Sequence, residues 1–178
     1  MIHSVLDLFI LSLLDRGLET PYDLNRQGGL SLGSTVPALR RLESAGLIKR
    51  KAPVGSSKRP RHWFQLSVTG KKLARSGWKV HLKASSHPDF DAVLRVVDMA
   101  QHYLAKPIDI VAFLEAAASE RRSQARPRAS GPSDTYNSFG LVTTRESWDV
   151  VRLRAEAKFL IGWGESLGKP LPKTRNPD

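Results

Sequence analysis

The segment Leu32–Gly46, with the sequence LGSTVPALRRLESAG, is followed directly by LIKRK at 47–51 and, after a loop, by RPRHWFQLSVTG at 59–70. Small and apolar residues recur at helical spacing in the first segment, and a glycine stands where its last turn would end. The other two segments are typical of short strands joined by a charged loop. A helix, a strand, a basic hairpin loop and a second strand, in this order, predict a winged helix-turn-helix.

Two more helices are expected before this segment. Val5–Asp15 places its large apolar residues on one stripe, which is the pattern of an amphipathic helix. Thr20 is a favourable N-cap and a proline follows it, which predicts a second, short helix at 21–27. These two helices and the one at 34–45 would form the helical part of the domain.

The third helix is expected to begin near Ser31 or Ser34. Pro37 should lie in or close to its first turn, because farther inside the helix it would remove a backbone hydrogen bond. Its inner face is predicted to consist of Thr35, Leu39 and Leu42.

The fold class is therefore mainly α with a small β-hairpin wing, and the second half of the chain is also predicted to be helical. Strands are expected at 47–52 and 62–67, a fourth helix from Ser67 or Thr69 to about Trp78, and further helices at 89–104, 108–122 and 146–167. The predicted domains are a winged helix-turn-helix at 1–85, a helical dimerisation and effector region at 86–167 with a mobile connector near 123–140, and a disordered tail at 168–178.

Positive charge is concentrated in the first half of the chain. The 178 residues carry a formal net charge of +11 and the pI is about 10.3. Residues 1–80 hold 14 Lys and Arg against 5 Asp and Glu, a net +9, whereas the remaining residues hold 14 against 12, a net +2. An excess of this kind indicates a polyanionic partner, with nucleic acid favoured over a membrane surface.

The residues that would contact double-stranded DNA follow from the geometry of this domain, in which the second helix of the pair enters the major groove. On the predicted helix the outward residues are Ser34, Val36, Pro37, Arg40 and Arg41. The hairpin would reach the phosphates with Lys49 and Arg50 on its first strand and with Lys58, Arg59 and Arg61 in its loop. An arginine pair can also be a solvated helix face, and charge can also protect an edge strand. The helix and hairpin are consecutive and equally basic, which favours DNA.

Residues 5–75 resemble the winged-helix domain of PadR-type transcriptional regulators. The resemblance rests on TPYDL at 20–24, on LSLGSTVPALRRLESAGLI at 30–48 and on RPRHWFQLSVTG at 59–70. Two residues depart from the family's pattern: Val36 stands where a tyrosine is frequent and Thr35 where a core leucine is usual. The resemblance implies a homodimeric repressor in which two winged domains bind a pseudo-palindromic operator, paired by C-terminal helices.

Apolar and aromatic residues mark the last predicted helix. They are expected to form a dimer interface or an effector pocket, and they are Trp148, Val151, Phe159, Leu160 and Trp163. Aromatic side chains are enriched in interfaces, which favours dimer packing. A small aromatic or hydrophobic effector is the other interpretation, and the resemblance makes it conceivable.

Several other functions are disfavoured by the sequence. The chain has no cysteine, its five histidines lack metal-ligand spacing, and no phosphate-cradling loop is present, so we expect no enzyme, no cofactor and no metal site. The apolar start of the chain lacks the flanks of a signal peptide, and a cytoplasmic location without membrane contact is expected. Two alternatives stay open: a winged-helix module that binds a protein partner, and a DNA-binding protein without sequence preference.

Overall fold

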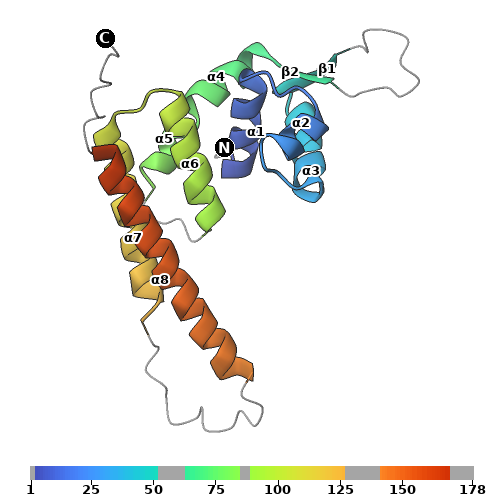
Figure 1. The fold of residues 1–178 in the computed structure, drawn as a ribbon. Coiled ribbons are helices and arrows are strands. Elements are labelled where there is room, and N and C mark those ends of the chain that lie inside the picture. The colour runs from blue at the N-terminus through green and yellow to red at the C-terminus, as the bar shows by residue number, and fades with distance from the viewer. Residues whose placement is uncertain (1–2, 52–62, 85–88, 127–140, 169–178) are drawn as a thin grey trace, which may run out of the picture. The chain divides into compact units, whose positions relative to one another are not determined.

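The computed structural model describes residues 3–51, 63–84, 89–126 and 141–168, with side chains except at 141–147 (Figure 1). Three predicted features lie outside these ranges: the loop of the basic hairpin, most of the connector expected at 123–140, and nearly all of the tail expected at 168–178. Lys58, Arg59 and Arg61 of the predicted wing belong to the first of them.

The described residues form eight helices and one two-stranded antiparallel sheet, so the predicted fold class is confirmed. In chain order the elements are α1 (Val5–Asp15), α2 (Pro21–Arg26), α3 (Leu32–Ser44), β1 (Ile48–Lys51), β2 (Trp63–Leu66), α4 (Val68–Ser76), α5 (Lys79–Leu82), α6 (Phe90–His102), α7 (Pro107–Gln124) and α8 (Leu141–Gly168). None of the described helices combines the length and the apolar character that crossing a membrane requires.

The chain forms two compact units, and each consists of two separate stretches of the sequence. Residues 1–83 pack together with 94–104, and residues 84–93 pack together with 105–178. The long α6 contributes to both units. The predicted division into domains at 1–85 and 86–167 remains a prediction.

Side-chain caps fix the starts of four helices in the first unit. Ser4, Thr20, Ser31 and Ser67 each accept a hydrogen bond from the backbone amide three residues later. Such a cap stabilises a helix by about 1 kcal/mol, because it satisfies an amide that has no partner inside the helix. The cap at Thr20 confirms the predicted start of the second helix.

The third helix begins at Leu32, so its N-cap is Ser31, the first of the two expected positions. Because the helix starts this early, Pro37 lies in its second turn rather than in or close to the first. Its ring nitrogen cannot donate to the carbonyl of Gly33, and one helical hydrogen bond is lost. Gly33 is exposed, so water can reach that carbonyl.

The inner face of α3 is buried as predicted. Thr35, Leu39 and Leu42 are inaccessible or nearly so, and Ala38 joins them. Thr35 stands in this core without an unsatisfied hydroxyl, because its Oγ1 donates to the carbonyl of Ser31 over 2.7 Å. The helix ends at Ser44, and Gly46 two residues later has a φ of 68°, the left-handed turn that glycine adopts at low cost.

The hairpin is attached closely to the helices. β1 and β2 pair antiparallel with Ile48 opposite Leu66 and Arg50 opposite Phe64. The backbone amide of Phe64 also donates to the carbonyl of Glu19, over 2.8 Å. This bond ties the second strand to the turn before α2, so the sheet is held against the helix pair.

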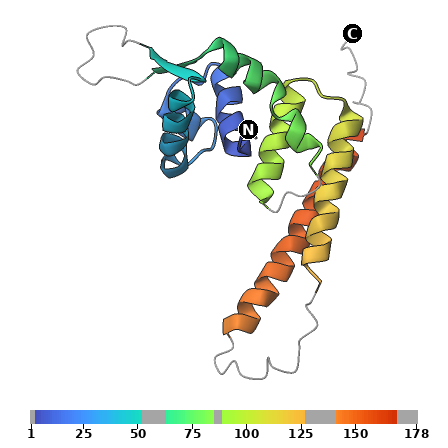
Figure 2. The same ribbon diagram turned by 180° about the vertical axis from the view of Figure 1, so that it is seen from behind.

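The second unit contains a pair of antiparallel helices, α7 and α8, which lie side by side in both views (Figures 1 and 2). Arg121 is fully buried between them, and its Nε donates to Glu156 over 2.9 Å. Both helices are longer than predicted: Ser123 and Gln124, expected in the connector, belong to α7, and α8 begins at Leu141 instead of Glu146. α8 therefore runs well past the end of α7.

Candidate nucleic-acid interface

The outward face of α3 is accessible along its whole length. Its N-terminal half is apolar, with Leu32 51% exposed, Val36 37% exposed and Pro37 also exposed. Its C-terminal half is cationic, with Arg40 and Arg41 exposed. The helix therefore presents an apolar surface followed directly by positive charge.

Ser34 lies at the edge of this face and is only partly exposed. Its Oγ donates to the carbonyl of Ser31 over 3.0 Å and lies 2.9 Å from the Ser31 hydroxyl. The hydroxyl proton is therefore already used at the start of the helix. Of the outward residues in this half, Val36 and Pro37 offer no hydrogen-bonding side chain.

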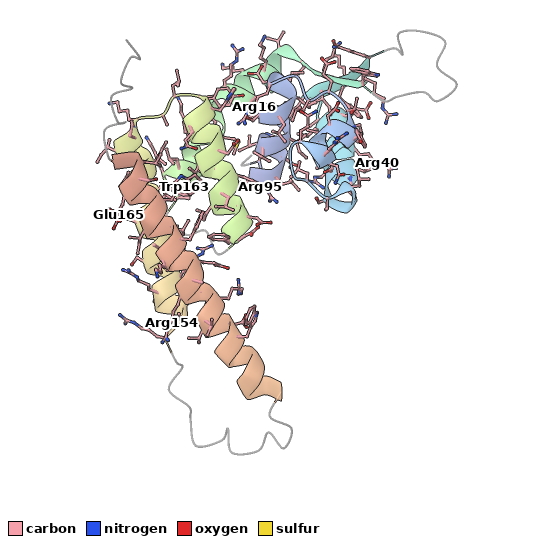
Figure 3. All side chains as sticks on the ribbon, viewed as in Figure 1. Arg16, Arg40, Arg95, Arg154, Trp163 and Glu165 are labelled. Atoms are coloured by element: carbon pink, nitrogen blue, oxygen red, sulfur yellow. The ribbon has the colours of Figure 1, made fainter. Side chains whose placement is uncertain are left out.

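The two adjacent arginines of α3 differ in what they contact. Arg41 donates through Nη2 to the Oδ1 of Asp7 over 2.8 Å, and the Asp7 side chain is only 13% exposed. The Arg40 side chain makes no hydrogen bond or ion pair with any other described residue and is exposed on the first unit (Figure 3). Within the described part of the chain, the Arg40 side chain is therefore available to bind a partner, whereas Arg41 is held against α1.

Lys49 and Arg50, the cations on the first strand of the hairpin, also differ in what they contact. Arg50 forms a bidentate pair with Glu43, at 2.8 and 3.0 Å, and its guanidinium lies 5.8 Å from the centre of the Phe64 ring. Lys49 is exposed, and its side chain has no hydrogen bond or ion pair within the described ranges. Arg50 and Glu43 are partly exposed, and such a pair contributes at most about 1 kcal/mol, so phosphates can compete for the arginine.

Three residues of this interface were not identified from the sequence. Leu32 could have been found, because it lies one turn before Val36 on the same face. Asp7 and Glu43 could not, because each reaches its arginine through tertiary contacts that have no signature in the sequence. These two carboxylates decide which arginines are free.

The five residues of α8 that were predicted to form a dimer interface or an effector pocket do not share one environment. Trp148, Val151 and Phe159 are exposed on α8, whereas Leu160 is completely buried and Trp163 is half-buried. The Phe159 ring lies 5.9 Å from the Trp163 ring and 6.0 Å from that of Phe90.

A shallow hollow in the second unit involves none of these five residues. It is lined by Arg122, Arg154, Ala157, Lys158 and Ile161. Within the described ranges, no three potential metal ligands come together.

Comparison of the sequence with family models and with curated proteins gives no match. Among solved structures, the chain is similar to the one described as the crystal structure of Bacillus subtilis PadR in complex with operator DNA. The two chains are 16% identical over 91% of this chain and 97% of that one, with a TM-score of 0.38. Membership in the PadR family remains a prediction from the motifs.

Proposed function

We propose that this chain is a transcriptional regulator that binds double-stranded DNA sequence-specifically, inserting α3 into the major groove. The observation that carries the proposal is the outward face of α3, where the exposed Arg40 has no partner among the described residues. An unpaired arginine can donate two hydrogen bonds to the O6 and N7 of guanine without first losing an intramolecular ion pair.

The positively charged residues around this face are suited to binding the phosphates of a DNA duplex. Lys49 follows α3 on the first strand of the hairpin and would bind phosphate, as would Lys58, Arg59 and Arg61 of the predicted wing. The net charge of +9 in residues 1–80 would draw the polyanion to this unit and make its affinity strongly dependent on salt.

A homodimer is the second element of the proposal. α8 runs past the end of α7 and carries exposed Trp148 and Val151. Exposing large apolar side chains to water is unfavourable, and a second copy would cover them. Two copies on a two-fold axis would bind half-sites about one helical turn of DNA apart, as a repressor on a pseudo-palindromic operator does. A cytoplasmic location, the absence of enzymatic activity and a small aromatic or hydrophobic effector complete the hypothesis.

The test is selection of duplexes from a random library with the full chain, followed by fluorescence anisotropy over a salt series. The proposal predicts an enriched inverted repeat, which at physiological salt binds at least about 10³-fold more tightly than a shuffled duplex. Equal affinities that collapse together as salt rises would contradict sequence-specific binding and favour a protein that binds DNA by charge alone. Absence of any duplex binding would favour a module that docks an acidic protein.

A further inference from the structure

The apolar half of the outward face of α3 is exposed and not packed into the core. Leu32, Val36 and Pro37 are exposed, while the opposite face of the helix is fully covered by the core. An exposed apolar surface next to a cationic one indicates a partner that is itself apolar at one point and anionic around it.

The exposed side chains of this half, Leu32, Val36 and Pro37, have no hydrogen-bonding atom through which to recognise a partner. The hydroxyl of Ser34 already donates to Ser31, and Gly33, Val36 and Pro37 have no polar side-chain atoms. What remains is van der Waals and hydrophobic contact. A protein partner would meet the same surface, but Arg40 and Lys49 beside it are exposed cations without partners in the described ranges and favour a polyanion.

The edges of the bases in the major groove carry one apolar group, the C5 methyl of thymine. We propose that Val36 and Pro37, supported by Leu32, read thymine methyl groups, and that Arg40 reads a guanine one turn farther along the helix. Val36 and Arg40 are four residues apart, which is about 6 Å along the axis, and successive base pairs are about 3.4 Å apart. The thymine and the guanine therefore lie within about two base pairs of each other in each half-site. This inference rests on the proposed function and names what the same site recognises.

The experiment replaces the thymines of the selected duplex, one symmetry-related pair at a time, with deoxyuridine. This change removes the methyl group and keeps Watson–Crick pairing. Burial of one methyl predicts a roughly fourfold loss of affinity per half-site, and about 15-fold when both half-sites are changed. The loss is expected at one or two positions in each half-site and nowhere else.

The variant Val36→Ala assigns the effect to its residue. It removes two methyl groups from an exposed position and keeps a good helix former, so the fold is expected to persist. In Val36→Ala, the uridine penalty should fall below twofold at the position that Val36 reads, and a second position read by Pro37 should keep its penalty. Val80→Ala is the matched control, because Val80 is also exposed but lies on α5, and it should retain the full uridine penalty.

Failure of this inference can be told apart from failure of the proposed function. If the selected duplex is bound specifically but tolerates uridine at every position, or if Val36→Ala keeps the full penalty at every position, methyl readout by Val36 is wrong while sequence-specific binding stands. If no duplex is bound specifically, both are wrong.

Discussion

The guanidinium of Arg41 lies 2.8 Å from the carboxylate of Asp7, 34 residues earlier in the chain, and this pair joins α3 to α1. Arg40, the preceding residue, has no such partner among the described residues. A helix turns by about 100° per residue, so neighbouring side chains meet different surroundings. We infer that Arg41 orients the recognition helix and that Arg40 contacts the bases.

The pair between Glu43 and Arg50 predicts that DNA affinity can be raised. Glu43→Gln removes an acid next to the interface and frees Arg50 for a phosphate. We expect affinity for any duplex to rise severalfold at low salt, with the slope of log K against log salt steeper by about one unit. Anisotropy on the shuffled duplex over a salt series measures both.

Glu115→Gln is the control for that variant, since Glu115 is exposed on α7 and the change in net charge is the same. An equal effect of both variants would show that net charge alone matters. An unchanged affinity in Glu43→Gln would show that Arg50 does not contact DNA.

Close approach of α4 to the first strand predicts a strong effect at Gly70. A Cβ added there would overlap the carbonyl oxygen of Leu47, which belongs to the backbone and cannot move aside cheaply. Gly70→Ala should therefore lower the free energy of unfolding by about 3 kcal/mol or more, as measured by urea denaturation. Gly162→Ala, in α8, meets nothing within 4 Å and should instead stabilise by about 0.5–1 kcal/mol. Loss of less than about 1 kcal/mol in Gly70→Ala would contradict this packing.

Exposed residues of α8 predict the oligomeric state. The double substitution Trp148→Glu and Val151→Glu places charge on the proposed interface and should convert a dimer into a monomer in sedimentation velocity experiments. Arg154→Glu introduces a carboxylate at another exposed position of the same helix and should leave the dimer intact. A wild-type chain that sediments as a monomer would rule out the dimer.

The phenol of Tyr103 predicts a dependence of stability on alkaline pH. Burial raises the pKa of Tyr103 above its ordinary value of about 10, and the Asp15 carboxylate, which accepts a 3.2 Å hydrogen bond from the phenol, also raises it. The unfolded chain therefore loses this proton first, so the contribution to stability is complete below pH 10 and is lost as pH rises through the folded-state pKa.

Replacing this residue tests the sign of the effect. Tyr103→Phe should cost about 1 kcal/mol at neutral pH and unfold with a shallower loss of stability between pH 9 and 11 than wild type. Equal slopes in wild type and Tyr103→Phe would contradict the raised pKa.

Local sequence signals predicted most of the fold. The N-cap at Thr20, the buried face of α3 and the glycine turn at Gly46 all follow from periodicity and capping, which act over a few residues. The position of Pro37 was misjudged, because it depends on whether the helix starts after Ser31 or after Ser34 and both serines can cap. The start of α8 at Leu141, five residues before the predicted start at Glu146, was not identified from the sequence.

The candidate site was predictable in outline only. Outward positions of the recognition helix follow from its buried face, so Val36, Pro37 and Arg40 could be identified from the sequence. Which of the two arginines is free depends on Asp7, whose position relative to α3 is set by packing and not by local sequence.

The most direct test of the central claim compares Arg40→Ala with wild type on the selected duplex and on its shuffled form, at physiological salt. The account predicts that Arg40→Ala loses about 1–3 kcal/mol on the selected duplex and much less on the shuffled one, because two bonds to guanine are lost only where guanine is in place. Arg154→Ala removes the same charge from α8. It should lower the affinities for the selected and the shuffled duplex only slightly and to the same extent. An equal loss on both duplexes in Arg40→Ala, or no loss on either, would contradict the claim that α3 reads the sequence through Arg40.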